Sequence, residues 1–329
     1  MSAITTRFTA IIVNYNGGEL LLDCVRSIQN AGLVPQQIVV VDNGSKDQSI
    51  EWLQREISGC RLVLMGCNAG FAKAVNQGLR QTTSDYAVLI NNDARIDRSA
   101  LTALHQAFET HPRAAFLGGR LLNEDGSLQN AIALFPQVAA EWLPRPILKL
   151  LWPKRIEGRY NAEQDIQVES VIGALFCIRM AATLPLGLLD EDFFFFLEET
   201  EWCHRAWQHG WEVWHIPAAQ AVHLQGATAK KFNALARIEF HRSRLTYFKK
   251  TDPSGYLAVL LITWIKAFAN ALSNSLAVLL TLGLSTKIRQ KSAVYWKILA
   301  WYLSGCPQDV GLPDKCPASL GSRHGSGPA

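Results

Sequence analysis

The feature that most constrains the fold is a regular alternation of short apolar runs and amphipathic segments in the first third of the chain. Runs rich in β-branched residues predict strands, and apolar residues three and four apart predict helices. The expected strands are 8–13, 37–41, 61–65 and 86–90, and the expected helices are 19–31, 47–57, 71–81 and 98–110. Continuous apolar strands separated by helices are typical of a mostly parallel α/β sheet with helices on both faces. Ligands of such sheets bind beyond the carboxyl ends of the strands.

The composition is that of a globular protein that works without nucleic acid. The chain has 329 residues, 49% of them hydrophobic, so it can form one large domain and a smaller appendage. A net charge of +4 is too small to indicate a nucleic-acid partner. The seven cysteines are odd in number and lack C-x-x-C spacing, which predicts free thiols in a reducing compartment. Residues 1–7 carry no signal-like pattern, so we expect the chain to begin in the cytoplasm.

Polar turns follow the first two predicted strands. Asn14 and Asn16 come after the first strand, in a glycine-containing turn that lacks the G-x-G-x-x-G pattern of a dinucleotide fold. Asp42 follows the second strand and can accept hydrogen bonds from a nucleobase or a ribose hydroxyl. A tight turn or a helix cap explains each of these residues equally well when it is taken alone.

The third predicted strand is followed by Asn68, Gly70 and Lys73, which open a helix. Exposed backbone amides and a lysine in the first turn of a helix suit an anion such as a diphosphate. A helix cap would again account for Asn68 by itself. The three residues are therefore candidates for binding the phosphates of a donor.

The fourth predicted strand is followed by Asn91, Asn92 and Asp93. A carboxylate on a tight turn beside side-chain amides can hold a hard divalent cation that bridges phosphate oxygens. The alternative is a turn that only ends the strand. Four polar strand ends at one edge of a sheet are harder to explain structurally than any one of them, so together they predict a binding site.

A run of four phenylalanines, residues 193–196, leads into an acidic helix start. Acids are favoured in the first turn by the helix dipole, and an apolar wall would also raise the pKa of a carboxyl group and make it a useful base. Glu201 and Arg205 are four residues apart and predict a supporting ion pair. Glu198 is expected to point away from its neighbour Glu199, since adjacent helical residues face different directions.

These motifs resemble those of the family-2 inverting glycosyltransferases, and in particular a rhamnosyltransferase-like branch. The matching motifs are IIVNYNG at 11–17, VVVDNGS at 39–45, N-x-GFA at 68–72 and NND at 91–93. Their order and combination are specific, and the resemblance covers residues 8–250. It implies a GT-A fold and transfer of a sugar from a nucleotide donor with inversion.

The resemblance also implies roles for individual residues. It places Asp42 at the base or ribose of the donor nucleotide, Asp93 on a divalent cation (Mg or Mn) and Glu199 as the catalytic base. The family's metal motif is often D-x-D, whereas this chain has Asn91 at the first position. His223 fits the family's V-H-x-x-G segment, although a lone histidine at a strand end is more commonly structural. With Asn91 unable to supply a negative charge, His223 is expected to be the second metal ligand.

The composition changes along the chain and predicts three regions. Residues 1–228 are expected to form the GT-A domain, 229–304 a basic and amphipathic helical region, and 305–329 a disordered tail rich in Gly, Pro and Ser. Within the helical region, residues 256–284 are strongly apolar but carry a polar stripe at helical spacing. The stripe consists of Thr263, Lys266, Asn270, Ser273 or Asn274, and Thr281.

Such a helix with basic flanks fits an anchor lying in the plane of an anionic membrane. A transmembrane span and a soluble helical subdomain remain as alternatives. An in-plane anchor predicts peripheral binding at the cytoplasmic face of the inner membrane. The expected acceptor is a glycan hydroxyl, lipid-linked, in cell-surface polysaccharide synthesis, and dTDP-L-rhamnose is the expected donor.

Two other classes of protein are compatible with parts of this pattern. A nucleotidyltransferase that makes sugar nucleotides would share the architecture, but the turn at residues 14–18 lacks the cations of a triphosphate loop. A non-catalytic membrane scaffold could keep a degenerate GT-A fold. The presence of Asp42, Asp93, Glu199 and His223 argues against a scaffold, whereas Asn91 leaves room for one.

Overall fold

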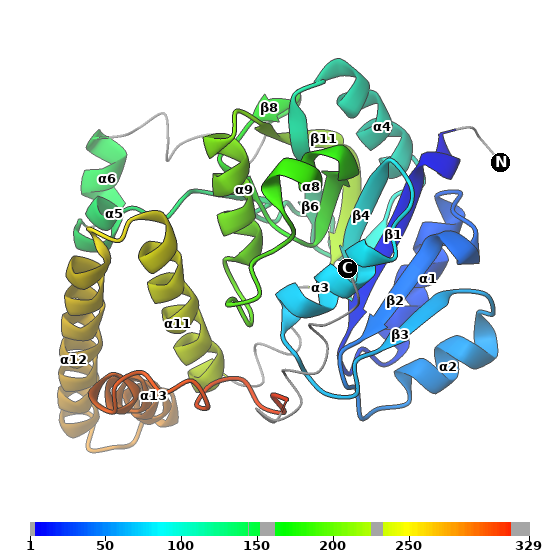
Figure 1. The fold of residues 1–329 in the computed structure, drawn as a ribbon. Coiled ribbons are helices and arrows are strands. Elements are labelled where there is room, and N and C mark those ends of the chain that lie inside the picture. Colours follow the sequence, from blue (N-terminus) through cyan, green and yellow to red (C-terminus); the bar gives the residue numbers. More distant parts are fainter. Residues whose placement is uncertain (1–3, 144, 152–161, 225–232, 317–329) are drawn as a thin grey trace, which may run out of the picture.

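A computed structural model describes residues 4–143, 145–151, 162–224 and 233–316. Several features of the sequence lie outside these ranges, namely the basic residues Lys230 and Lys231, Gln225 and Gly226 after the histidine, and the tail from residue 317. Figure 1 shows a central sheet covered by helices, with α11, α12 and α13 standing together at one side of it.

The described residues contain a nine-stranded sheet of order β3-β2-β1-β4-β10-β6-β11-β5, with β8 paired to β11. The strands are β1 (Phe8–Asn14), β2 (Ile38–Asp42), β3 (Arg61–Leu64), β4 (Tyr86–Asn91), β5 (Ala94–Ile96), β6 (Ala114–Leu122), β8 (Ile166–Gln167), β10 (Leu175–Arg179) and β11 (Glu212–His223). Two short strands, β7 (Ile132–Ala133) and β9 (Ser170–Val171), pair separately. Strands β1 to β4 are parallel to one another, as the alternating pattern predicts.

The second half of the sheet is less parallel than the sequence pattern suggests. Strand β10 runs antiparallel to both β4 and β6, and β11 is antiparallel to β5 but parallel to β6. Residues Glu212–His223 form the single strand β11, whose register against β6 shifts between Ile216 and Gln220. The α/β fold class is confirmed, and the mixed second half is what brings the end of β11 to the turn after β4.

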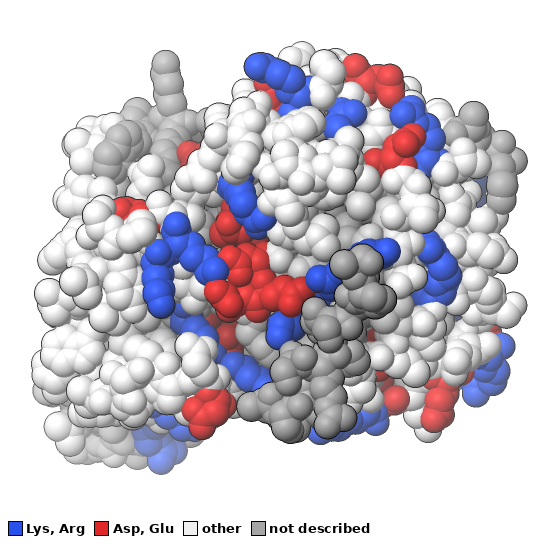
Figure 2. Space-filling view, in the orientation of Figure 1, with Lys and Arg blue, Asp and Glu red and all other residues white. Residues whose placement is uncertain are grey.

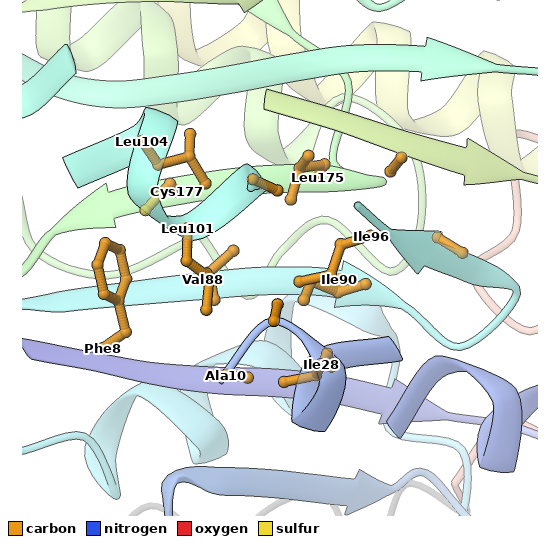
Figure 3. Close-up of a cluster of buried hydrophobic side chains, with 14 of the residues drawn as sticks. Phe8, Ala10, Ile28, Val88, Ile90, Ile96, Leu101, Leu104, Leu175 and Cys177 are labelled. Carbon is orange, nitrogen blue, oxygen red and sulfur yellow. The ribbon is translucent and has the colours of Figure 1, made fainter. Parts of the chain in front are cut away.

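Helices cover both faces of the sheet because each strand alternates its side chains between them. In β1, Phe8, Ala10 and Ile12 face α1 (Glu19–Asn30), α2 (Ser49–Glu56) and α4 (Ala100–Thr110). Ile11 and Val13 face α3 (Phe71–Arg80), α8 (Met180–Leu186) and α9 (Glu198–Gln208). Figure 3 shows the first cluster, in which the labelled residues include Phe8, Ala10, Ile28, Val88, Ile90, Leu101 and Leu104.

A second core joins the helical region to the sheet domain. It packs α11 (Asn233–Thr251), α12 (Tyr256–Leu280) and α13 (Thr286–Leu303) around Phe248, Val259 and Trp301, and it includes Phe193 from the loop before α9. The short helices α5 (Val138–Trp142) and α6 (Arg145–Leu151) lie beside the top of α12 in Figure 1. Within the described residues, α12 is the one helix long and apolar enough to cross a membrane.

Many of the large apolar side chains of α12 face outward. Thr263 and Asn274 of the predicted polar stripe are buried against the rest of the protein, and Lys266 donates to the carbonyl oxygen of Glu141. The opposite side of the helix exposes a continuous row, Leu257, Leu261, Ile265, Phe268, Leu272, Leu276, Leu279 and Leu280. We call these eight residues the α12 apolar face. The side of the molecule that α12 forms is almost free of charged side chains in Figure 2.

Two sequence predictions fail at the C-terminal end. Residues 305–316, expected to begin a disordered tail, are packed against the sheet domain, and Cys316 forms a disulfide with Cys67 across 249 positions. The prediction that all seven cysteines are free thiols is therefore wrong for this pair. Spacing could not reveal it, because only the fold brings the two residues together. The other five cysteines are free.

Candidate active site

The polar strand ends meet at one edge of the sheet, as predicted. Asn14 lies opposite Asp42 in the register of β1 and β2, and Val13 lies opposite Asn91 in the register of β1 and β4. The turns that follow these strands are therefore neighbours in space. They form the floor of the candidate site.

Asn14 ties these turns together. Its side chain is fully buried, and its Nδ2 donates to Oδ1 of Asp42 at 3.2 Å and to Oγ of Ser49 at 2.8 Å. Its Oδ1 accepts a hydrogen bond of 3.1 Å from Nδ2 of Asn92. Both polar atoms of its side chain are engaged, so Asn14 orients Asp42 and Asn92. Its expected contact with the donor stays a prediction.

The turn after β2 is held in one conformation by its own polar groups. The second oxygen of Asp42 accepts from the backbone N–H of Ser45 at 3.2 Å. Asn16, whose φ is +52°, accepts from the N–H of Lys46 through its side-chain oxygen at 2.8 Å. The two turns that follow β1 and β2 are thus joined, with Asp42 buried between them.

The turn after β3 is fixed by Asn68 and Gly70. Oδ1 of Asn68 accepts from Nδ2 of Asn43 at 2.9 Å and from the N–H of Gly70 at 3.2 Å. Gly70 has φ of +96°, and a Cβ there would lie 2.8 Å from the ring of Phe194. The backbone N–H of Phe71, at the start of α3, donates to the carbonyl oxygen of Phe194 at 2.7 Å. Glycine is therefore needed where the phenylalanine loop meets this turn.

Lys73 lies in the first turn of α3, where the sequence predicted a cation for phosphate. Its side chain is half-buried. None of the ion pairs formed within the described part of the chain involves Lys73. The charge is thus not neutralised by a nearby carboxylate there.

Asp93 and His223 come together although 130 positions separate them in the chain. Nε2 of His223 lies 3.3 Å from Oδ1 of Asp93 and 3.3 Å from Nδ2 of Asn91. The backbone completes this contact, since the N–H of Leu224 donates to the carbonyl oxygen of Asp93 at 3.1 Å. The end of β11 and the turn after β4 therefore form one unit.

Gln129, which the sequence analysis did not single out, determines the tautomer of His223. Its Nε2 donates to the carbonyl oxygen of His223 and, at 2.7 Å, to Oδ1 of Asn123. Its Oε1 must then be the acceptor that faces Nδ1 of His223 at 3.1 Å. The Nδ1 atom carries the proton in the neutral ring, which leaves the lone pair of Nε2 directed at Asp93 and Asn91.

This arrangement fits one end of a divalent-cation site. A carboxylate beside an imidazole lone pair, whose other nitrogen is held by an outer hydrogen bond, is a common ligand arrangement. No group of three or more His, Cys, Asp or Glu in the described ranges could hold a metal, and this site offers two such residues, Asp93 and His223. Two protein ligands leave room for phosphate oxygens and water, which Mg²⁺ keeps when it binds nucleotides.

The acidic start of α9 holds two interacting carboxyl groups. Burial, followed by the charge of Glu199, raises the pKa of Glu198 well above its usual range. Burial also raises the pKa of Glu199, opposed by hydrogen bonds from its own backbone, from the backbone of Gly173 and from the side chain of Glu198. The sequence analysis expected Glu198 to point away from Glu199, and this expectation is wrong. The two carboxyl groups share one buried environment.

This pair is held on a strained and well-supported helix start. Phe196 and Leu197, directly before α9, have φ of +74° and +65°, a conformation that costs energy in bulky residues. Arg205 binds Glu201 through two hydrogen bonds of 3.0 and 2.7 Å, which confirms the predicted ion pair. Arg205 also donates to the carbonyl oxygen of Leu188 at 3.0 Å, so it fastens the loop between α8 and α9.

The loop between α8 and α9 is also paired with neighbouring cations. Lys250 of α11 contacts Asp190 and Asp192 at 2.6 Å each, and Arg80 of α3 contacts Glu191 at 3.2 Å. Figure 2 shows acidic side chains gathered between α11 and α3, bordered by Lys and Arg. The loop is thus held from both the sheet domain and the helical region.

A two-residue segment connects the acidic pair to the turn after β4. The backbone of Gly173 forms a hydrogen bond with the carboxyl group of Glu199. The carbonyl oxygen of the next residue, Ala174, accepts from the N–H of Asn91 at 3.3 Å. Glu199 and the Asn91 turn therefore lie on adjacent sides of one short stretch of chain.

Comparisons with known proteins agree with this geometry. The sequence model of the family described as "Glycosyl transferase family 2" matches residues 9–183, just over half of the chain. An N-acetylglucosaminyl-diphospho-decaprenol L-rhamnosyltransferase of Mycobacterium tuberculosis is 24% identical over 265 residues, covering 76% of this chain and 85% of that protein. The low-salt glycan biosynthesis hexosyltransferase Agl10 of Haloferax volcanii is 22% identical over 277 residues, covering 78% and 82%.

The fold is also similar to that of a solved structure, GalNAc-T7 with UDP, GalNAc and Mn²⁺. The TM-score is 0.51 and the identity 16%, and the match covers 75% of this chain and about half, 51%, of that longer one. The fold and the polar strand ends together define a glycosyltransferase of the GT-A type. More narrowly, the chain belongs to glycosyl transferase family 2.

Proposed function

We propose that this protein transfers a sugar from a nucleotide donor to a glycan hydroxyl with inversion at the anomeric carbon, using Glu199 as the base. The observation that carries the proposal is the position of Glu199, a carboxyl group of raised pKa that reaches the Asn91–Asp93 turn through Gly173 and Ala174. A base next to the donor turn is what direct displacement at an anomeric carbon requires.

In this mechanism the carboxylate of Glu199 takes the proton of the attacking hydroxyl as the bond to the anomeric carbon forms. The bond to the nucleoside diphosphate breaks on the opposite side of the sugar. Burial makes Glu199 a stronger base than an exposed glutamate, because its charged form loses solvation. The hydrogen bond from Gly173 keeps the carboxylate oriented.

The leaving diphosphate develops negative charge, and three features of this chain would stabilise that charge. Lys73 and the backbone amides of the first turn of α3 provide positive potential at the N-terminal end of this helix. Asp93 and His223 would hold a divalent cation, Mg or Mn, which supplies charge neutralisation at the diphosphate when bound. Asp42 would bind the ribose or base, and Asn16, Asn68, Gly70, Asn91 and Asn92 would shape the donor pocket around it.

The relatives narrow the proposed substrates. One relative is an L-rhamnosyltransferase that acts on a lipid-linked N-acetylglucosamine, and another is a hexosyltransferase of glycan biosynthesis. We take dTDP-L-rhamnose as the donor and a lipid-linked glycan of cell-surface polysaccharide synthesis as the acceptor.

The α12 apolar face supports a place at a membrane surface. Leu257 is 71% exposed and Leu280 is 77% exposed, although α12 is packed on its other side. Exposed cations follow directly in α13, at Lys287, Arg289 and Lys291. An apolar row beside cations fits an anionic leaflet, which we take to be the cytoplasmic face of the inner membrane.

A nucleotide-sugar panel tests the proposal. The purified protein is heated with each nucleotide sugar, with and without Mg²⁺ or Mn²⁺, and its melting temperature is recorded. A ligand that binds only the folded state raises this temperature, so one donor with metal should stand out, and dTDP-L-rhamnose is expected. Stabilisation by nucleoside triphosphates instead, with formation of a sugar nucleotide, would point to a nucleotidyltransferase.

A further inference from the structure

The residues after α13 run from the helical region toward the turns that follow β1, β2, β3 and β4, which we call the donor turns. We call residues 307–316 the C-terminal strap. It follows α13, contacts α11 and the ring of Phe194, and ends beside the turn after β3. None of the roles described above uses it.

The strap is fastened to the turn after β3 by covalent and hydrogen bonds. Cys316 forms the disulfide with Cys67, and its backbone N–H donates to the carbonyl oxygen of Asn68 at 2.9 Å. Asn68 and Lys315 also form an isolated parallel bridge. The strap thus adds a short stretch of extended chain to the turn that presents Asn68 and Gly70.

Asp314 connects the strap to the turns after β1 and β2. Its Oδ2 accepts a hydrogen bond of 2.7 Å from the hydroxyl of Tyr15, and its Oδ1 pairs with Nζ of Lys46. Burial and the interaction with Asp314 raise the pKa of Tyr15 to about 12, so the phenol stays a donor at neutral pH. Three of the four donor turns therefore touch the strap.

The other end of the strap is anchored in α11. The carboxylate of Glu239 is fully buried and binds Nζ of Lys315 at 2.9 Å and Nη1 of Arg242 at 2.6 Å. Arg242 also donates to the carbonyl oxygen of Pro307 at 2.9 Å. Nζ of Lys315 lies 4.5 Å from the centre of the Phe194 ring. A buried charge cluster of this kind is costly to separate, so the strap cannot slide freely.

We propose that the C-terminal strap is a positioning element of the donor site, and that Asp314 and Cys316 hold Tyr15 and the turn at residues 66–70 in the conformation that receives the nucleotide. This inference rests on the proposed function, since it names the donor site as its target. Turns between strands and helices are otherwise mobile, and ordering them before binding lowers the cost of binding.

The first test measures the turns themselves and needs no substrate. Amide hydrogen exchange is followed at residues 66–70 in the oxidised full-length protein, in the protein reduced by dithiothreitol, and in Cys316→Ser. Faster exchange in the last two supports the proposal, because the turn loses its fastening. Cys306→Ser, which changes the free cysteine directly before the strap, is the matched control and should exchange like wild type. Unchanged exchange after reduction overturns the proposal.

The second test separates positioning from general stability. Asp314→Ala should raise the donor KM about ten-fold, the scale expected for loss of one charged hydrogen bond. Cys316→Ser, which removes the disulfide, should also raise the donor KM, and both variants should keep kcat near wild type. The melting temperature of each variant is recorded beside the kinetics. A lower donor KM would show that the strap covers the site instead, and an unchanged KM in both variants also overturns the proposal.

A double-mutant cycle tests whether Asp314 acts through Tyr15. Tyr15→Phe and Asp314→Ala remove the two partners of one hydrogen bond, so their effects on donor KM should not add. Additive effects contradict this route. If no nucleotide stabilises even the wild-type protein, the proposed function fails, whereas the exchange experiment still decides whether the strap orders residues 66–70.

Discussion

The lone pair of Nε2 of His223 faces Oδ1 of Asp93 at 3.3 Å. The proton of the neutral ring lies on Nδ1, because Nδ1 donates a hydrogen bond to Oε1 of Gln129. The pair stands where the end of β11 meets the turn between β4 and β5. His223 lies opposite Ala94 in the antiparallel pairing of β11 with β5, and this pairing sets His223 beside Asp93. The geometry therefore links an unusual feature of the sheet to the proposed metal chemistry.

Loss of the proposed metal ligands should have graded effects. Asp93→Ala removes the only carboxylate of its turn and is expected to abolish turnover at any practical metal concentration. His223→Ala leaves that carboxylate and should raise the metal concentration needed for half-maximal activity. Titration of MgCl₂ and MnCl₂ against initial rate, starting from chelator-treated protein, measures both effects.

His215 provides the matched control because it lies in the same strand, β11, and is buried. Its substitution by Ala should lower the melting temperature without moving the metal requirement. Full turnover of the wild-type protein in excess chelator would remove the metal from the mechanism. An unchanged metal requirement in His223→Ala would return that histidine to a structural role.

Gln129 is expected to strengthen metal binding without being a ligand itself, because it orients the ring of His223. Gln129→Leu removes the acceptor that keeps the proton on Nδ1 of His223, and loss of such outer partners typically weakens metal binding about 10–100-fold. Gln129→Glu keeps an acceptor at that position and should recover part of the affinity. Metal titrations of the two variants, with melting temperatures measured alongside, provide the comparison; equal metal affinities for Leu, Glu and wild type would contradict the assigned role.

The proposed base should impose a pH limit on activity. Since the folded-state pKa of Glu199 is raised, its carboxylate is lost as pH falls through a value above the usual pKa of about 4.3. As the pH is lowered, kcat/KM should therefore begin to decrease at a pH above this usual pKa. Glu199→Gln should lower kcat by about 10²–10⁴-fold, the usual cost of losing a general base, while donor binding persists.

Glu198→Gln is the matched control for this prediction. Glutamine imitates the protonated form that burial favours at Glu198, and it can still donate toward Glu199. Its kcat should stay within about ten-fold of wild type. If the two phenotypes were reversed, the base would be Glu198, and wild-type turnover in both variants would remove this acidic pair from the mechanism.

The sequence predicted the first four strands and their polar ends because both depend on local patterns. Apolar runs specify buried strands, and each turn follows directly from its strand. Strand β6 was missed even though residues 114–122 are largely buried, since its glycines interrupt the apolar pattern. The contact between Asp93 and His223 followed from family resemblance and not from spacing.

Features that depend on distant contacts were not predictable from local pattern. Gln129 gains its role only because β11 ends beside it, and Cys67 meets Cys316 only after the helical region docks. The sequence showed the polar stripe of α12. It did not show whether the stripe faces protein or solvent, because that depends on how α12 packs against α13 and α5. Thr263 and Asn274 of the stripe are buried against the protein, whereas Lys266 and Ser273 are exposed, so the protein covers part of the polar side.

The orientation of α12 gives the membrane proposal a test that does not disturb the fold. Removing the region after α11 would delete most of the core of the helical region and expose its α11 side chains Leu245, Tyr247 and Phe248, so truncation is uninformative. Leu272→Gln combined with Leu276→Gln instead alters two exposed side chains, 48% and 57% accessible. Each buried leucine contributes about 1.5–3 kcal/mol, so vesicle binding should weaken at least ten-fold per substitution if both enter the bilayer.

Leu184→Gln is the control, because Leu184 is 86% exposed but lies in α8 of the sheet domain. It should leave vesicle binding unchanged. Binding of the wild type to anionic vesicles should also decrease as salt rises, since screening weakens the attraction of Lys287, Arg289 and Lys291 to the lipid surface. Wild-type binding by the double α12 variant would exclude the α12 apolar face as the anchor. Release from native membranes by detergent alone, and never by salt or alkali, would contradict in-plane binding and favour a helix that spans the bilayer, because only a span keeps its apolar surface in lipid when charge is screened.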